Sequence, residues 1–124
     1  MSPMPVVKES EMEMDYAEGD EIHYAVIMVT AANLDQAKDI ARALVEEEIV
    51  ACVNILQGML SIFRWKGKIE EGAECLLIIK TRMSRLPEVI SRVKSIHTYD
   101  VPEIIALPII DGNPAYLQWI EEVT

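Results

Sequence analysis

The chain has 124 residues, 51% of them hydrophobic and 26% charged, and its formal net charge is -10. That length and apolar content are typical of one compact domain. A polyanionic nucleic acid would be repelled by the acidic excess, and no basic stripe offsets it, so we exclude nucleic acid as the expected partner.

The sequence shows no pattern typical of a membrane or secreted protein. No apolar run approaches the roughly 18 residues that a membrane helix needs, and the acidic first twenty residues lack the apolar segment of a signal peptide. The two cysteines are too few for a disulfide framework. We therefore expect a cytoplasmic protein without a membrane partner.

Residues 1–21 differ in composition from the rest of the chain. They contain seven acidic residues and one basic residue, and so account for six of the ten net negative charges. Like charges without a helical or strand period predict a disordered tail rather than a functional arm. The folded domain is expected to span residues 22–124.

A strand and a helix are predicted first. Tyr24–Val29 is an apolar, partly β-branched run that is typical of a buried strand. Asn33 follows as a helix N-cap, and Gln36 completes a capping box. The helix then carries one apolar stripe, formed by Ala37, Ile40, Ala41, Leu44 and Val45. It ends at Glu46–Glu48.

A long hairpin comes next. Ile49–Trp65 is an extended segment, and the glycine inside it, Gly58, predicts a bulge or kink. Lys66–Gly67 has the length of a two-residue hairpin loop, whose second residue is free to take a positive φ. The return strand ends at Thr81.

The last third of the chain predicts a helix, a strand and a short helix. Ser84 is expected to cap the first of these, whose apolar stripe is Leu86, Val89, Ile90 and Val93. Ile104–Ile110 is the fourth strand. Asn113–Pro114 opens the final helix, since proline is tolerated at the first helical position. One side of that helix carries Tyr116, Ile120 and Val123.

The order of these elements predicts the fold. A βαββαβ chain with two right-handed crossovers forms a four-stranded antiparallel sheet with both main helices on one face. The fold class is therefore α+β, a ferredoxin-like sandwich with an extra C-terminal helix.

The strands predict self-association. Val26–Val29, Leu76–Ile79 and Ile104–Leu107 are apolar on both faces, whereas a sheet with one solvated face alternates apolar and polar residues. Two helices cover only one face, so six to eight aliphatic side chains would stay exposed, each contributing roughly 1.5–3 kcal/mol if buried. We expect a homo-oligomer in which sheets pack on sheets. The alternative is a monomer whose terminal helix covers that face.

The cysteines are interpreted as structural residues. If the hairpin turns at Lys66–Gly67, Cys75 faces Gly58, and Cys52 lies six positions farther along, about 20 Å away at roughly 3.3 Å per residue. That separation excludes a disulfide and a shared metal site within one chain. No CxxC, HxH or HxxxH pair is present, and no phosphate loop or GxSxG elbow.

Polar residues gather in the segment after the second helix. His97, Tyr99, Asp100 and Glu103 lie within seven residues in an expected loop, where functional residues are common. The alternative is structural, because a histidine at a helix C-terminus is favoured by the helix dipole and Pro102 simply stops the helix. Spacing alone leaves both interpretations open.

Five segments together resemble the CutA divalent-cation-tolerance family. They are Ala51–Ile55, Ser61–Ile69, Ile79–Thr81, His97–Ile104 and Tyr116–Ile120. Their order and spacing extend from residue 22 to residue 124. The resemblance implies a ferredoxin-like homotrimer, related in architecture to the PII signalling proteins, with sheets facing a central core. It also implies a cytoplasmic role in tolerance to copper and other divalent ions.

The resemblance also implies a copper site, from which this chain departs. Similar bacterial proteins bind copper through a cysteine before the threonine that ends the first strand and through a His-His pair after the second helix. Here Val29 occupies the cysteine position and Ile96 that of the first histidine, so His97 is the remaining metal ligand. Thr98 replaces the usual proline.

The leading hypothesis is a non-catalytic trimer that binds copper, another divalent metal ion or a small molecule in clefts between subunits. The resemblance implies cleft residues Trp65, Lys80, Tyr99 and Glu103. One alternative is a PII-like signalling trimer without a metal role, although its hairpin is expected to be regular strand. Another is an enzyme that uses Tyr99, His97 and Glu103 as acid–base groups, which would require them to converge on a substrate.

Overall fold

A computed structural model describes residues 22–124, and the predicted tail lies outside the described residues. The strands are β1 (Tyr24–Ala31), β2 (Cys52–Trp65), β3 (Lys68–Arg82) and β4 (Ile104–Ile109). The helices are α2 (Leu34–Glu46), the 3-10 turn η2 (Met83–Arg85), α3 (Leu86–Ile96) and α4 (Pro114–Val123). The expected α+β, ferredoxin-like order is confirmed, with the C-terminal helix added to it.

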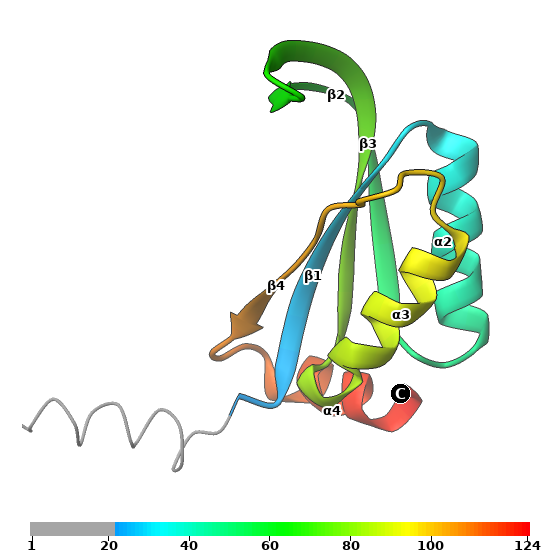
Figure 1. Cartoon of the computed structure of the whole chain (residues 1–124). Helices are drawn as coiled ribbons and strands as arrows, with labels where there is room; N and C mark the ends of the chain where they lie inside the picture. The colour runs from blue at the N-terminus through cyan, green and yellow to red at the C-terminus, as the bar shows by residue number, and fades with distance from the viewer. Residues whose placement is uncertain (1–21) are drawn as a thin grey trace, which may run out of the picture.

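The four strands form one antiparallel sheet in the order β2-β3-β1-β4. Helices α2 and α3 lie side by side on one face of this sheet, and α4 lies at one end of it (Figure 1). The first strand of the chain is thus in the middle of the sheet, between β3 and β4. Among residues 22–124, no helix covers the middle of the opposite face.

The hydrophobic core lies between the sheet and the two helices. Along β1, alternate side chains point to this side and are fully buried: Ala25, Ile27, Val29 and Ala31. On β3 the same alternation buries Cys75, Leu77 and Ile79, and the helices add Ala37, Ile40, Leu44, Val89 and Val93. The stripes predicted for α2 and α3 therefore supply this core, except Val45, which is exposed, and Ile90, which is partly buried outside the core cluster. Of the side predicted for the last helix, Ile120 is buried, whereas Tyr116 and Val123 are exposed.

The start of α2 differs in part from the predicted capping box. The Asn33 side chain accepts a hydrogen bond from the Gln36 N–H at 2.9 Å, as an N-cap does. The Gln36 side chain turns away instead of closing the box. Its Oε1 accepts from the Thr98 N–H at 2.9 Å and from the Thr98 hydroxyl at 2.7 Å. Gln36 thus links α2 to the loop after α3, because its side chain binds the polar groups of Thr98 instead of the backbone of Asn33.

The prediction that Ser84 caps the second main helix is wrong. Ser84 lies inside the 3-10 turn η2, and α3 begins at Leu86 without a side-chain cap. The N–H of Leu86 donates to the Met83 carbonyl. Because Pro87 lacks an N–H, the first turn of α3 also has one donor fewer to satisfy. A backbone hydrogen bond of the 3-10 turn therefore replaces the side-chain cap at the start of α3.

The hairpin of β2 and β3 turns where the sequence predicts. Trp65 pairs with Lys68, and the two loop residues have positive φ, 51° at Lys66 and 78° at Gly67. The register then continues regularly to the pair of Met59 with Glu74. An irregularity follows between Leu56 and Met59, at a residue with φ of 78°, Gly58.

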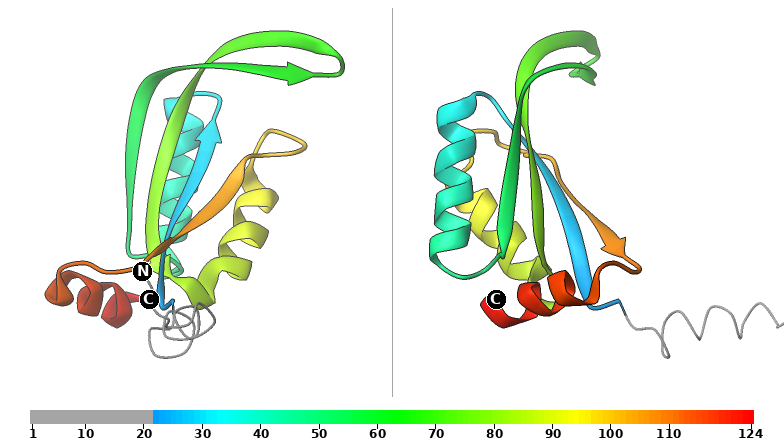
Figure 2. Two further views of the ribbon diagram at one scale, coloured as in Figure 1. Left: turned by 90° about the vertical axis from the view of Figure 1, so that its left-hand side faces the viewer. Right: turned by 180° about the vertical axis from the view of Figure 1, so that it is seen from behind.

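Beyond this bulge the hairpin bends away from the rest of the sheet and over its uncovered side (Figure 2). The kink predicted at Gly58 is therefore confirmed. The second strand begins later than predicted, at Cys52 rather than Ile49. Glu48 has a left-handed φ of 61° and turns the chain there, so the strand starts four residues later, at Cys52.

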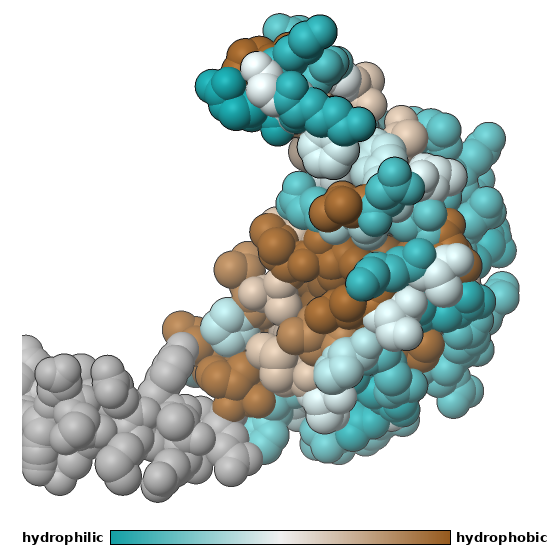
Figure 3. Space-filling view, in the orientation of Figure 1, coloured by the Kyte–Doolittle hydropathy of each residue, from teal (hydrophilic) through white to brown (hydrophobic). Residues whose placement is uncertain are grey.

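The uncovered face of the sheet is apolar, as the strand pattern predicts. Figure 3 shows hydrophobic side chains gathered over β1 and β4. Leu56, Ile105 and Leu107 are each about half exposed there, at 53%, 50% and 48%. We call this surface the open face, formed by Val26, Met28, Leu56, Leu76, Ile78, Ile105 and Leu107. Within residues 22–124 no helix is long and apolar enough to cross a membrane.

Candidate functional site

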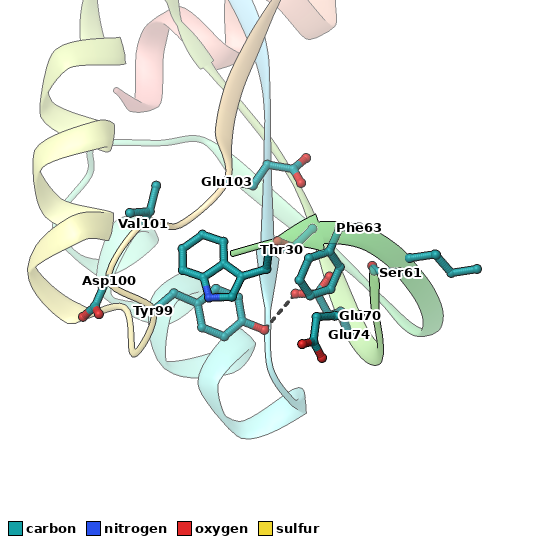
Figure 4. Close-up of a pocket in the computed structure, with 11 residues that line it drawn as sticks. Thr30, Ser61, Phe63, Glu70, Glu74, Tyr99, Asp100, Val101 and Glu103 are labelled. Atoms are coloured by element: carbon teal, nitrogen blue, oxygen red, sulfur yellow. Dashed lines mark hydrogen bonds between the residues drawn. The ribbon is translucent and has the colours of Figure 1, made fainter. Parts of the chain in front are cut away.

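A cavity of about 800 Å³ lies beneath the bent hairpin. It is lined by Thr30, Ser61, Ile62, Phe63, Trp65, Glu70, Glu74, Tyr99, Asp100, Val101 and Glu103. The hairpin forms one wall, and the loop between α3 and β4 forms another (Figure 4). That volume lies in the range of small-molecule sites in proteins, about 300–1,000 Å³.

The cavity continues the open face along β3. Successive side chains of a strand point to opposite faces, so Glu70 and Glu74 share a face with Ile78. Across the hairpin, Phe63 pairs with Glu70 and Ser61 with Gly72, which brings β2 residues to the same side. The bend at the bulge turns this end of the sheet over the hollow. The cavity and the apolar surface are thus two parts of one side of the sheet.

Tyr99 crosses the cavity from the loop after α3. Its hydroxyl donates a hydrogen bond to Glu74 Oε2 at 2.7 Å, and Figure 4 shows the ring reaching toward that carboxylate. Burial, followed by the hydrogen bond and the negative charge of Glu74, raises the pKa of Tyr99 to about 12. The phenol therefore stays protonated near neutral pH and fixes the Glu74 carboxylate in place.

His97 holds the base of that loop. The Tyr99 N–H can only donate, so the His97 Nδ1 at 3.0 Å accepts. His97 Nε2 then carries the proton and donates it to the Thr30 carbonyl at 2.7 Å. The two rings, His97 and Tyr99, are 4.6 Å apart between centroids. Both nitrogens of the histidine thus have partners, and the imidazole ties the loop to the end of β1.

Four carboxylates line the cavity, and no lysine or arginine lines it. They belong to Glu70, Glu74, Asp100 and Glu103. Among the described residues the ion pairs are Arg85–Glu88 and Arg92–Glu47, both on the helical side of the molecule. Residues 22–124 contain no group of three or more His, Cys, Asp or Glu side chains placed to hold a metal ion. The acids are spread around the cavity rather than focused on one point.

The structure brings three of the four predicted cleft residues together. Trp65, Tyr99 and Glu103 all line the cavity. Lys80 does not: it lies farther along β3, on the same face as Glu74 but six residues on, about 20 Å at roughly 3.3 Å per residue. Its ammonium group donates to the Asn54 side chain. The predicted metal ligand, His97, is outside the lining, with its ring centroid 4.6 Å from that of Tyr99.

Sequence reasoning missed several cavity residues, chiefly Phe63, Glu70 and Glu74. Part of the signal was available. The predicted hairpin register places Glu70 opposite Phe63, and alternation along a strand places Glu74 on the same face as Glu70. Contact between the loop after α3 and β3 has no comparable signal, because it depends on how the crossover packs.

The two cysteines are free and lie apart, as predicted. Cys75 is buried on the helical side of β3. Cys52 is partly exposed and pairs across the strands with Lys80 on the other side. The bulge shifts the pairing of β2 with β3 by one residue, so that Cys52 pairs with Lys80. The two cysteines still lie several residues apart along the strands.

Comparisons with known proteins agree on one family. The family described as "CutA1 divalent ion tolerance protein" matches residues 25–123. "Protein CutA" of Mus musculus is 51% identical over 96 residues, which are 77% of this chain and 54% of that protein. "Divalent-cation tolerance protein CutA" of Thermus thermophilus is 48% identical over 99 residues, 80% of this chain and 96% of that protein.

A solved structure supports the same match. CutA1 from Oryza sativa superposes with a TM-score of 0.81 at 46% identity, covering 83% of this chain and 94% of that chain. The chain spans about half the length of the mouse relative and almost the full length of the Thermus relative.

Proposed function

The chain belongs to the CutA1 divalent ion tolerance family, and from this premise we propose that it acts in tolerance to divalent cations, copper among them. It does so as a non-catalytic homotrimer that binds a metal ion or a small molecule in clefts between subunits. The compartment is the cytoplasm. The divalent-cation role is proposed from the names of the similar proteins. The cleft is proposed from the structure of the chain itself.

The observation that carries this proposal is the continuity between the open face and the cavity. A second copy packed on the apolar strands would lie against the side of the sheet on which Glu70 and Glu74 line the hollow. Burying half-exposed aliphatic side chains favours such packing, at roughly 1.5–3 kcal/mol for each fully buried side chain. A subunit cleft at this position would contain Trp65, Tyr99 and Glu103.

For copper, His97 is the proposed ligand. Binding at Nε2 requires that the ring proton move to Nδ1 and that the hydrogen bond to the Thr30 carbonyl break. A protonated Nδ1 can no longer accept from the Tyr99 N–H, so copper binding should loosen the loop that carries Tyr99. Copper prefers nitrogen ligands of this kind, and a trimer would supply further ligands from neighbouring copies.

Binding fits the site better than acid–base catalysis does. The Tyr99 hydroxyl donates to Glu74, and both nitrogens of His97 are hydrogen-bonded, Nδ1 to the Tyr99 N–H and Nε2 to the Thr30 carbonyl on β1. The hairpin is strand on both sides of the bulge at Gly58, and it ends in a two-residue turn. A PII-like relay through a flexible signalling loop therefore has no structural observation in its favour.

Calorimetric titration of the full chain with Cu²⁺ tests the metal part of this proposal. We expect binding that weakens at least tenfold in His97→Ala and stays within twofold in Glu46→Gln, on the far side of α2. Unchanged affinity in His97→Ala would remove the histidine from the site. No copper binding at all would leave the metal role without support.

A further inference from the structure

We infer that the cavity beneath the hairpin binds a small organic cation, specifically an aliphatic amine with two or more ammonium groups. This inference rests on the proposed function, since it names the ligand class for the same cleft. It is carried by three observations: the sign of the charge, the aromatic side chains and the size of the hollow.

The charge around the cavity is of one sign. Glu70, Glu74, Asp100 and Glu103 contribute carboxylates, while no basic side chain lines the space or pairs with them among the described residues. A cleft lined by one sign of charge focuses the field and concentrates counter-ions of the opposite sign. A polyamine would neutralise several of these acids at once, whereas an anionic metabolite would be repelled.

The acids are arranged for an extended ligand. In Figure 4, Glu70 and Glu74 lie on the hairpin side of Tyr99, while Asp100 lies on the other side of that ring. No three of them converge on a point that suits one metal ion. A chain with ammonium groups at intervals can reach acids on both sides, which a single small ion cannot do.

Aromatic side chains provide the second kind of contact. Trp65, Phe63 and Tyr99 line the same cavity as the four acids. The faces of such rings attract ammonium groups, and they also pack against the methylene segments between them. Because Tyr99 stays protonated and bonded to Glu74, its ring is held in a fixed position. The lining thus combines charge with apolar surface, as an alkylamine requires.

The volume fits this class of ligand. About 800 Å³ is far more than a metal ion fills and is ample for a linear triamine with its water. The hollow also opens onto the side of the sheet where a second copy would pack, so a neighbouring subunit would close it further. The cavity lining therefore suits a flexible organic cation, while His97, outside that lining, is the proposed copper ligand.

Titration of the full chain with spermidine tests this inference. Two matched carboxylate variants, Glu103→Gln and Glu70→Gln, remove a charge from the cavity without breaking a hydrogen bond of the structure. Each should weaken spermidine binding about tenfold, since a charge-assisted contact is lost. Glu46→Gln removes the same charge from the exposed end of α2 and should change the affinity less than twofold.

Tryptophan fluorescence locates the bound amine. The chain has two tryptophans, so Trp119→Phe leaves Trp65 as the reporter of the cavity, and Trp65→Phe leaves Trp119 at the other end of the molecule. Spermidine should change the emission of the first variant and leave that of the second unchanged. Equal responses of both variants would indicate binding over the general surface and would overturn the inference.

Two other outcomes would also overturn it. The first is the absence of spermidine binding up to about 5 mM, a range that covers weak specific binding. The second is an equal loss of affinity in Glu46→Gln and Glu103→Gln. If the chain forms trimers and binds Cu²⁺ through His97 while spermidine fails, the proposed function stands and this ligand class alone is rejected.

Discussion

The Tyr99 hydroxyl donates to the Glu74 carboxylate at 2.7 Å, joining the loop after α3 to the middle of β3. These residues are 25 positions apart in the chain, and helix α3 separates them. Because the loop carries Val101 and Glu103 as well, this bond sets the distance between the two walls of the cavity. It is also the one hydrogen bond between cavity-lining side chains that the described residues make.

Tyr99→Phe should destabilise the chain by about 1 kcal/mol. The substitution removes a hydrogen bond to a charged acceptor, typically about 1.5–3 kcal/mol, and partial exposure lowers that figure. Chemical denaturation gives the free energy of unfolding. Tyr24→Phe is a matched control, since it removes a Tyr–Glu bond to Glu121 far from the cavity. An unchanged denaturation midpoint in Tyr99→Phe would show that the bond does not hold the loop.

Alkaline pH should weaken the same contact. The Tyr99 pKa is about 12 in the folded chain, against about 10 for tyrosine in an unfolded one. A group whose pKa is raised on folding stabilises fully below its unfolded pKa, and the stabilisation disappears as pH rises through the folded value. The contribution of Tyr99 should therefore be constant below about pH 10 and disappear toward pH 12.

Ultraviolet titration of tyrosinate checks this expectation. The wild type should show one more late-ionising tyrosine than Tyr99→Phe does. The difference in unfolding free energy between the two proteins should also shrink as pH rises from about 10 toward 12. A difference that persists at the alkaline end would mean that the stabilising contact does not depend on the phenol proton.

A feature could be predicted from the sequence when the residues that form it are close together in the chain. The hairpin turn, the Asn33 cap and the kink at Gly58 are local, and each was predicted from a few neighbouring residues. The capping role of Ser84 was predicted wrongly, since the backbone of a 3-10 turn satisfies the end of α3 instead.

The cavity depends on longer-range packing. Trp65, Tyr99 and Glu103 were predicted as one cleft by resemblance, while the partnership of Tyr99 with Glu74 was not. Hairpin register places Glu74 correctly along β3, yet it says nothing of which loop will cross above it. Lys80 lies on the same face of β3 as Glu74, but it is six residues farther along the strand and does not line the cavity.

Gly58→Ala should destabilise the hairpin by about 1–2 kcal/mol. Its φ of 78° lies in the left-handed region, where a Cβ is strained even though no atom lies within 4 Å of that position. The control is Gly72→Ala on the facing strand. That glycine has no positive φ and the same open surroundings, so alanine there should be neutral or slightly stabilising.

Thermal or chemical denaturation of the two variants measures this difference. Because the bulge bends the hairpin over the cavity, Gly58→Ala should also weaken any ligand bound beneath it. Equal stability of the two variants would mean that the bulge relaxes without cost, and that the bend of the hairpin has another origin.

Leu107→Glu should convert the assembled protein into single chains. Leu107 is 48% exposed on the edge strand β4 and pairs with Val26 of the central strand β1 on the open face. A carboxylate there would be buried without a partner if a second copy packs on that surface, which costs several kcal/mol. Fold stability should change little, because the side chain is half exposed in the isolated chain. Circular dichroism should therefore remain that of the wild type.

Sedimentation velocity gives the outcome, since one chain has a mass of 14.0 kDa and a trimer three times that. Ser91→Glu introduces the same charge on the exposed side of α3 and should leave the assembly intact. If the wild type itself sediments as a single chain at micromolar concentration, the open face has no second copy and the cleft between subunits does not exist. If Leu107→Glu assembles as the wild type does, the copies meet through another surface, and the edges of β2 and β4 become the next to test.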